Sequence, residues 1–494
     1  MTVLKRPIAG RRVYGRLILL IGLLIAVPVL VVPFYPDEAQ YIHAFITPSL
    51  FSVALGATLS FSASKRQLLI AEWQSPLEGG IPVMFAWCFA FFVGAVPFLI
   101  GQQLNLFQAL FESVSGWTTT GLTVVNVTEI PHIFLFQRSF MQYCGGLGFI
   151  IMVAMFVQSN QNMNLYSAEG HPDRIMPSLK STTRTICLLY GCLLVAGTLI
   201  YWLFGMKFFD AICHTMSAVS TAGFTTQANS IGEYGSLPIE IFTILLMLIG
   251  ATNFAVLLLL LTGKFRSIFR VTEVRFMIGM LLVFVPLIGF SLWKSLDMDF
   301  SESIIQSTFG VVSTFTTSGY SLMNFTLWPP FASGLLLLLM FFGGCAGSTA
   351  GGLKLFRIYL LFRIAKENVR NRLSPVHRVT APSYIRAQGK TLIDDALIKD
   401  TLGFVVCYIG IYIVGTLLLS LSTEASLQDA MFEFASAFGT AGISCGLTSP
   451  DLSVGSLLVL MGGMILGRLE IFVVFVGAYS GIQMLGKAIK KLLQ

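Results

Sequence analysis

Charged residues are scarce in this chain of 494 residues. Asp, Glu, Lys and Arg make up only 11% of the sequence, whereas hydrophobic residues make up 55% and the mean hydropathy is +0.80. Soluble domains carry about 25% charged residues, so this chain has too little polar surface to face water on all sides. The scarcity excludes a soluble enzyme, a disordered scaffold and a nucleic-acid-binding protein. It predicts an α-helical protein that crosses the lipid bilayer several times.

Three signatures of site chemistry are also missing. The eight cysteines form no CxxC pair, and the five histidines lie far apart without an HExxH motif. This usage is typical of buried apolar side chains and not of a disulfide framework or a zinc site. No segment matches the phosphate-binding pattern G-x-x-x-x-G-K-[ST]. We therefore expect a protein that is not an enzyme and holds no organic cofactor.

Long apolar runs are frequent, and ten of them approach or exceed the roughly 20 residues that a helix needs to cross a bilayer. They lie at about 14–34, 43–63, 81–101, 134–158, 185–206, 237–262, 275–293, 331–363, 397–421 and 454–484. Shorter segments lie between some of them, near 105–118, 208–220, 301–316 and 428–439. Because these are too short to cross about 30 Å of hydrocarbon, we expect re-entrant helices that enter the membrane and turn back.

The basic residues are gathered in clusters, and 27 of the 31 Lys and Arg residues belong to them. The clusters lie at 5–16, 65–66, 174–184, 264–275, 354–399 and 487–491. If the ten spans alternate in direction, all six clusters fall on one side of the membrane. The positive-inside rule then predicts that both termini are cytoplasmic. The run Leu17–Val32 lacks a small-residue cleavage site, so we expect an uncleaved first span.

The four short segments share one pattern. Aligned on a glycine, the windows are FESVSGWTTTGLT, CHTMSAVSTAGFT, FGVVSTFTTSGYS and FEFASAFGTAGIS. Each has a serine six residues before the glycine, a threonine two residues before it and a hydroxyl residue two residues after it. The residue thirteen positions before each glycine is an acid or an amide, which is suited to the start of a helix. These residues are Gln108, Asp210, Gln306 and Asp429. The unit of span, short helix, glycine loop and span thus occurs four times in one orientation.

Loops of this composition are suited to a monovalent cation. Their carbonyl and hydroxyl oxygens are neutral and can replace the water around the ion, and non-helical backbone survives in a membrane only where protein or a wet cavity surrounds it. Glycine permits positive φ, which lets carbonyls point at a common axis. The candidate metal ligands are Thr119, Thr120, Gly121, Thr221, Ala222, Gly223, Thr317, Ser318, Gly319, Thr440, Ala441 and Gly442.

The expected fold is an all-α polytopic membrane protein. Four tandem helix–pore-helix–helix repeats surround one pore, and two extra transmembrane helices precede them. The expected parts are the N-terminal pair (1–75), repeat one (76–160), repeat two (180–263), repeat three (272–366), a cytoplasmic connector (367–396) and repeat four (397–494). The mixed-charge connector is either a solvated link or a docking surface for a soluble partner.

The windows TTTG, STAG, TTSG and GTAG, each between two spans, resemble those of the Trk/Ktr/HKT superfamily of potassium transporters. The resemblance covers essentially the whole chain, and the two extra N-terminal spans are more similar to bacterial Trk subunits than to the shorter Ktr subunits. It implies K⁺ uptake, with symport among the possible modes, in a bacterial inner membrane. It also implies a homodimer and a cytosolic nucleotide-binding regulatory ring of the TrkA type.

The run 331–363 contains a segment dense in glycine, GGCAGSTAGG at 343–352. Each glycine costs about 1 kcal/mol relative to alanine inside a helix, so the segment should break the helix just below the glycine loops, unless it serves close helix packing. The resemblance implies an intramembrane gating loop, and the candidate gating residues among its glycines are Gly343, Gly344, Gly347 and Gly351.

Arg468 lies inside the last apolar run. A charge at membrane depth is rare and suggests function. Either its side chain reaches the cytoplasmic boundary along its own helix, or it faces the pore below the four glycine loops, which would form the selectivity filter, and takes part in gating.

Two other functions stay open. A Na⁺-permeable pore is one, because site size and ligand field are structural quantities that the sequence does not give. A cation-coupled secondary transporter of another small solute is the other. It explains a broken helix but not four matching glycine loops.

Overall fold

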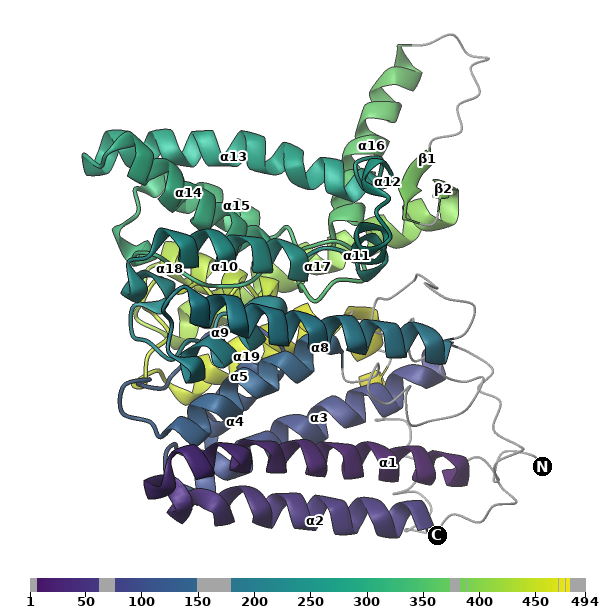
Figure 1. Ribbon diagram of the computed structural model, residues 1–494. Helices are drawn as coiled ribbons and strands as arrows, with labels where there is room; N and C mark the ends of the chain where they lie inside the picture. The colour runs from purple at the N-terminus through teal and green to yellow at the C-terminus, as the bar shows by residue number, and fades with distance from the viewer. Residues whose placement is uncertain are drawn as a thin grey trace, which may run out of the picture.

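The computed structural model describes residues 7–61, 76–148, 179–373, 383–387, 389–469, 471–475 and 477–479. Long helices run side by side through the molecule (Figure 1). They are α1 (Pro7–Ala26), α2 (Ile42–Phe61), α3 (Pro76–Ile100), α8 (Leu179–Leu203), α13 (Thr272–Leu296) and α17 (Asp395–Ser422).

Four shorter helices each follow a long one in the chain. They are α4 (Leu106–Trp117), α9 (Phe208–Val219), α14 (Phe300–Phe315) and α18 (Leu427–Gly439). The helices that come after them are α5 (His132–Leu147), α10 (Leu237–Gly250) with α11 (Phe254–Leu261), α15 (Pro330–Met340) with α16 (Leu355–Arg372), and α19 (Val454–Arg468). The order long helix, short helix, further helix therefore occurs four times.

Small elements join these helices. The helical ones are η1 (Val27–Phe34), η2 (Pro36–Tyr41), η4 (Ser230–Tyr234), α12 (Phe265–Ile268) and η5 (Phe325–Leu327). The sequence did not predict the antiparallel hairpin of β1 (Ser383–Arg386) and β2 (Gly389–Leu392), in which Ser383 pairs with Leu392. The hairpin lies within the predicted connector, beside α16 at one edge of the molecule (Figure 1).

The described helices account for the apolar runs in different ways. Six are long and apolar enough to cross a membrane, or up to eight if each of two bent pairs counts as one span. Of the ten predicted spans, 134–158 is described only as far as α5, since residues 149–158 lie outside the described part. The run 331–363 is interrupted, as predicted, between Met340 and Leu355. The predicted boundaries at 75, 160 and 494, and parts of the basic clusters, also lie outside it.

Two breaks were not predicted. α10 and α11 meet at 113°, and α19 meets the following helical segment at the same angle. Asn253 stabilises the first break because its side chain accepts a hydrogen bond from Ala255 N at 2.7 Å and caps α11. Glycine density identifies the break after α15, but the break at Ala251–Asn253 has no such signature.

The short helices begin at identifiable caps. Asn105 and Gln108 form a reciprocal capping box on α4, with N–H to oxygen distances of 3.0 and 3.2 Å. Ser426 accepts from Asp429 N at the start of α18. The same expectation for Gln306 is wrong, because α14 begins six residues earlier, at Phe300.

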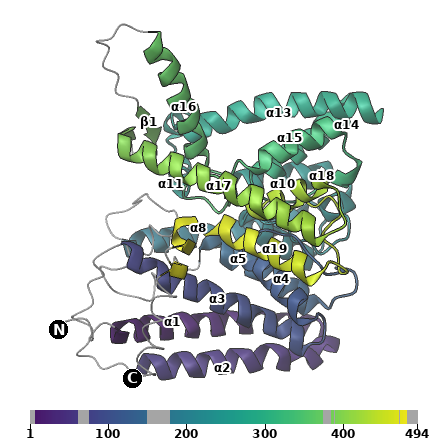
Figure 2. The ribbon, with the colours of Figure 1, turned by 180° about the vertical axis from the view of Figure 1, so that it is seen from behind.

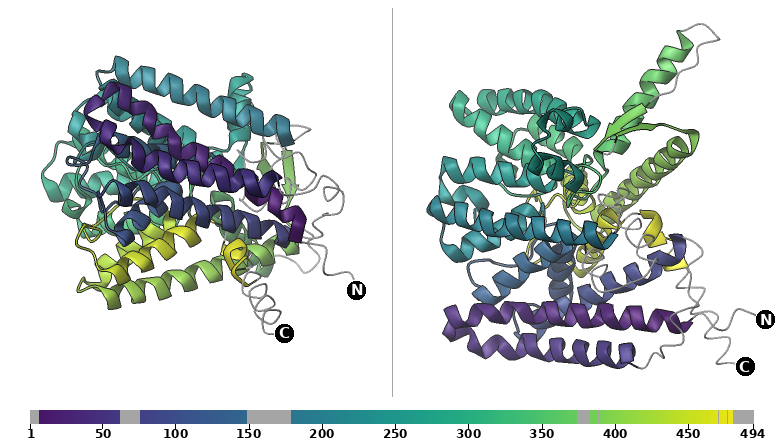
Figure 3. Two further views of the ribbon diagram at one scale, coloured as in Figure 1. Left: turned by 90° about the horizontal axis from the view of Figure 1, so that it is seen from below. Right: turned by 45° about the vertical axis from the view of Figure 1, so that its right-hand side comes forward.

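The long helices present their apolar side chains outward. Leu282 of α13, Val406 of α17 and Leu188 of α8 are exposed, whereas most of α4 and α18 is buried. An apolar exterior around a buried interior suits lipid as the solvent. α1 and α2 pack on each other and on α3 (Figure 3), and α17 packs on α19 (Figure 2). The chain is a multi-pass helical membrane protein.

Candidate functional site

Each short helix ends in the same unusual turn. The threonine two residues before each aligned glycine has left-handed backbone, with φ of 56° at Thr119, 50° at Thr221, 58° at Thr317 and 52° at Thr440. The next residue donates its N–H to the carbonyl of the aligned serine, over 2.8 to 3.0 Å, and the bonds run from Thr120 to Ser115, Ala222 to Ser217, Ser318 to Ser313 and Ala441 to Ser436. This is a Schellman-type helix end.

Threonine is an uncommon residue for this turn. A β-branched side chain in the left-handed region is strained by about 1–2 kcal/mol, and such strain is concentrated at functional sites. The sequence predicted positive φ at the glycines. Three of them have it, with φ of 93° at Gly121, 79° at Gly319 and 72° at Gly442, but Gly223 does not. The strained positions common to all four loops are the threonines.

The glycines are required because the loops approach one another closely. A Cβ on Gly121 would lie 2.8 Å from Gly223 N, and one on Gly223 would lie 2.6 Å from Ser318 O. A Cβ on Gly319 would lie 2.6 Å from Ala441 O. The sequence of contacts closes on itself, because a Cβ on Gly442 would lie 2.2 Å from the carbonyl oxygen of Thr120. Four segments far apart in the chain thus meet in cyclic order.

The predicted ligand residues are therefore brought together. All twelve are buried or partly buried, and none carries a charge. Within the described part of the chain, the buried Oγ1 atoms of Thr119 and Thr440 have no hydrogen-bond partner. The other two threonine hydroxyls contact the segment 341–354, as described below. Buried polar groups are usually paired, so the two free hydroxyls need an explanation.

Some members of the other two hydroxyl columns stabilise their loops, whereas the buried hydroxyls of Ser217 and Ser436 have no hydrogen-bond partner in the described part of the chain. Ser115 Oγ donates to Leu122 O and Ser313 Oγ donates to Tyr320 O, each at 2.6 Å, so each serine ties its helix to the residue after the glycine. Two residues after the glycine, Thr123 donates to Glu112 at 2.9 Å and Ser444 donates to Glu433 at 2.8 Å.

The glycine-rich segment forms a loop, residues 341–354, between α15 and α16. It enters the break between α10 and α11, where Cys345 N donates to Ala251 O at 2.9 Å and Thr349 N donates to Gly250 O at 3.2 Å. Asn253 Nδ2 donates to Ala346 O at 2.6 Å. Glu273, in the first turn of α13, accepts from Ala346 N at 2.9 Å.

This loop lies directly against the second, third and fourth glycine loops. The hydroxyls of Thr349 and Thr221 are 3.1 Å apart, and Gly351 N donates to Thr317 Oγ1 at 3.1 Å. A Cβ on Gly351 would lie 1.9 Å from Thr440 Oγ1, so this glycine is required by contact with the fourth loop.

Arg468 is the last residue of α19 and contacts the loop. Its Nη1 donates to Thr349 O, and its Nη2 donates to Gly145 O at 2.7 Å. Lys354 Nζ donates to Ala350 O, so two cationic side chains bind adjacent carbonyls of the loop. A cavity beside them is lined by Ser348, Gly352, Lys354 and Arg468, among others. These contacts direct the side chain of Arg468 toward the loop 341–354, and its part in gating stays a prediction.

Residues 44–481 match the TrkH family, described as a cation transport protein. The match spans well over half of the chain. The chain belongs to this family.

TrkH and TrkG proteins align with it almost end to end. The chain is 31% identical to the Trk system potassium uptake protein TrkH of Escherichia coli K12, over 94% of this chain and 97% of that one. It is 30% identical to TrkG of the same organism, over 94% and 96%. Its fold matches the crystal structure of the potassium transporter TrkH from Vibrio parahaemolyticus with a TM-score of 0.83, at 28% identity, over 95% and 98% of the two chains. Membership in a transport family confirms that the chain is not an enzyme.

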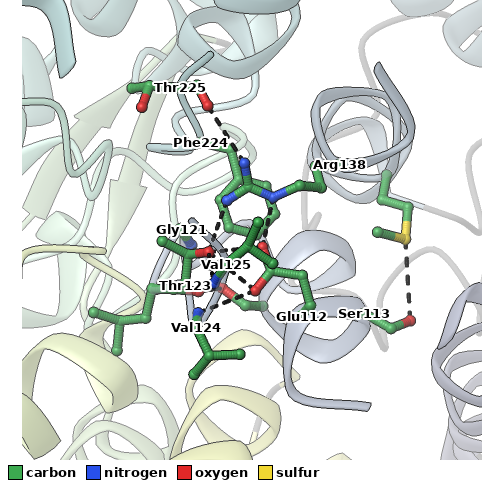
Figure 4. A network of polar contacts seen from close by, with 12 residues as sticks. Glu112, Ser113, Gly121, Thr123, Val124, Val125, Arg138, Phe224 and Thr225 are labelled. Atoms are coloured by element: carbon green, nitrogen blue, oxygen red, sulfur yellow. Dashed lines mark hydrogen bonds and ion pairs between the residues drawn. The ribbon is translucent and has the colours of Figure 1, made fainter. Parts of the chain in front are cut away.

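Sequence reasoning missed one part of the site. Glu112, the seventh residue of α4, pairs with Arg138 of α5 (Figure 4), and the sequence did not predict this pair. Arg138 lies outside the six basic clusters, so a count of the remaining basic residues could have found it.

Proposed function

We propose that this chain takes up K⁺ through a single pore, lined where the four glycine loops meet. The cyclic contact of Gly121, Gly223, Gly319 and Gly442 carries the proposal, because it brings four neutral, oxygen-rich loops around one axis. Rings of carbonyl oxygens can replace the hydration shell of a monovalent cation. The unpaired hydroxyls of Thr119 and Thr440 fit a site whose partner is the transported ion.

The loop 341–354 acts as the gate in this proposal. It contacts three of the four filter threonines, and Arg468 and Lys354 bind its carbonyls. A cation fixed in the path repels K⁺ and holds carbonyls that the ion would otherwise meet. Opening then requires that the loop leave the break at Ala251 and that Arg468 release Thr349.

The basic side of the molecule is cytoplasmic in this proposal, and so are both termini. A cytosolic nucleotide-binding ring of the TrkA type docks there, near the exposed Arg370 and Arg372 at the end of α16, and the subunit works as a homodimer in a bacterial inner membrane. Support comes from the charge asymmetry and from relatives that are named as proteins of a Trk system.

Ion flux into proteoliposomes tests the function. Purified protein should take up ⁸⁶Rb⁺, and excess K⁺ should compete better than excess Na⁺. Gly223→Ala places a Cβ 2.6 Å from Ser318 O and should reduce this discrimination by about tenfold or more, because carbonyl positions decide selectivity. Gly279→Ala in α13 is the matched control, since its Cβ would enter open space. Equal competition by Na⁺ in the unsubstituted protein would favour a Na⁺-permeable pore, and uptake that depends on an organic solute would favour a coupled transporter.

A further inference from the structure

Arg138 and Glu112 form a buried ion pair beside the first glycine loop. The side chain of Arg138 is 1% exposed, that of Glu112 is fully buried, and Arg138 Nε lies 2.5 Å from Glu112 Oε1 (Figure 4). Burying opposite charges is costly, and removing one partner leaves the other unpaired in an apolar interior. The pair therefore needs a role that apolar packing of α4 against α5 would not supply.

The guanidinium group contacts two different glycine loops. Its Nη2 donates to Thr123 Oγ1 at 2.8 Å, two residues after Gly121. Its Nη1 donates to Thr225 O at 3.3 Å, and its Cζ lies 4.0 Å from the centre of the Phe224 ring, directly after Gly223. One planar, always charged group thus joins the segments that follow the first and second glycines (Figure 4).

Two side chains next to Arg138, those of Glu112 and Gln142, also hold the first and second glycine loops. Glu112 also accepts from Thr123 Oγ1 at 2.9 Å and from Val124 N at 3.3 Å, so it holds the first loop directly. Gln142 lies four residues after Arg138, on the same face of α5. Its Oε1 accepts from Phe224 N at 3.2 Å, so α5 holds the second loop through two side chains.

The fourth glycine loop is held differently. Glu433 occupies the position of Glu112, nine residues before the glycine, and is fully buried. Among the described residues, its donors all belong to its own loop, namely Ser444 Oγ at 2.8 Å, the N and Sγ of Cys445 at 3.0 and 3.2 Å, and Thr448. The described contacts of Glu433 include no cation. A glutamate suffices to hold one loop, and the arginine is what connects one loop to the next.

We propose that Arg138 is a positioning residue for ion selection. Together with Glu112 it fixes the first and second glycine loops relative to each other, and so sets the spacing of the oxygens that face the ion. Discrimination between K⁺ and Na⁺ depends on that spacing and on the ligand field. The inference rests on the filter proposed above and adds that its selectivity depends on an ion pair outside the ring of ligands.

Arg138→Lys tests the inference most directly. Lysine keeps a positive charge beside Glu112, but it lacks the fork that reaches Thr123 and Thr225 together. We expect the protein to insert and to keep a thermal midpoint close to that of the wild type, while the ratio of ⁸⁶Rb⁺ to ²²Na⁺ uptake falls by about tenfold. Arg275→Gln, which removes an exposed charge from the start of α13, should keep the wild-type ratio.

Paired substitutions separate charge from geometry. Glu112→Gln and Arg138→Gln should each lower both the ratio and the yield of folded protein, and the double variant should recover yield but not the ratio, because only the unpaired charge has been removed. A wild-type ratio in Arg138→Lys, or recovery of the ratio in the double variant, would overturn the inference. If Gly223→Ala also keeps the wild-type ratio, the filter itself is misassigned, whereas a loss in Gly223→Ala alone rejects only the role of Arg138.

Discussion

The hydroxyl of Thr221, at the end of the second short helix, lies 3.1 Å from the hydroxyl of Thr349 in the loop 341–354. Thr221 is one of the four strained threonines, and Thr349 also donates to Gly250 O at 2.9 Å and to Val219 O at 3.2 Å. Thr221 belongs to the proposed filter and Thr349 belongs to the proposed gate, so the two structures are in direct contact. A change in one structure is expected to be felt in the other.

Thr349→Ala removes these side-chain contacts but keeps the backbone bond of Thr349 N to Gly250 O. The loop should lose one hydrogen-bonding anchor worth about 1 kcal/mol, so basal Rb⁺ flux should rise by about fivefold. Proteoliposome uptake without any regulatory subunit measures this. Thr58→Ala is the control, because Thr58 is exposed and its hydroxyl donates to Leu55 O within its own helix. Basal flux that stays equal in both variants would count against a role for Thr349 in closure.

Arg468→Ala and deletion of Gly344–Gly347 should each raise basal K⁺ flux. Both changes disrupt the contact between the loop and Arg468, so they remove one barrier. The double variant should therefore add little to the larger single effect, which is the behaviour of coupled sites. Uptake measured for all four combinations decides the matter. Additive effects would mean two separate gates, and unchanged flux in Arg468→Ala would mean that this arginine only anchors the end of α19.

Thr440→Gly separates strain from ligation. Glycine relieves the left-handed backbone but increases the entropy of the unfolded chain, and these effects offset each other to within about 1 kcal/mol. The thermal midpoint should therefore change little, while K⁺ selectivity falls because the unpaired hydroxyl is lost. Thr440→Ser should restore selectivity, since it restores the oxygen. Selective uptake by the glycine variant would show that the threonine serves only the helix end.

Charge reversal at Arg370 and Arg372 should weaken docking of the proposed regulatory ring. Both residues lie in the last turn of α16, and both are exposed. Contacts made by exposed charges are screened by salt, so binding of the wild type should fall between 0.05 and 0.5 M salt, by about tenfold as an order of magnitude. Binding measured by pull-down against salt gives the result. A complex insensitive to salt and to both substitutions would leave the segment as a plain connector.

The sequence predicts the helical fold well because its main signals are local and strong. Apolar length identifies the long helices, and the glycine density of 343–352 identifies the break after Met340. The break at Ala251–Asn253 was not predicted. It is stabilised by hydrogen bonds to the loop 341–354, which lies almost a hundred residues further along the chain. Hydrogen bonds between such distant residues leave no periodic pattern in the local sequence.

The sequence identifies the residues of the site, but it does not give their backbone conformations or their hydrogen-bond partners. The spacing alone identifies threonine, serine and glycine columns, yet it assigns the positive φ to glycine in every loop, and Gly223 does not have it. It also cannot show that the hydroxyls of Thr123 and Ser444 are used by Glu112 and Glu433. The pairing of Arg138 with Glu112 required two helices to be placed side by side.

The burial of Glu112 and Glu433 has a consequence for ions other than the one carried. Each carboxylate is fully buried, and both are saturated by hydrogen bonds from their own loops or by Arg138. Ca²⁺ and Mg²⁺ bind proteins mainly through carboxylate oxygens that are free to coordinate. Neither glutamate offers such an oxygen, so millimolar Ca²⁺ or Mg²⁺ outside the cell should not block uptake at these positions. In Glu433→Asp the shorter side chain would no longer reach its donors, so its oxygens would be free to coordinate and should create such a block.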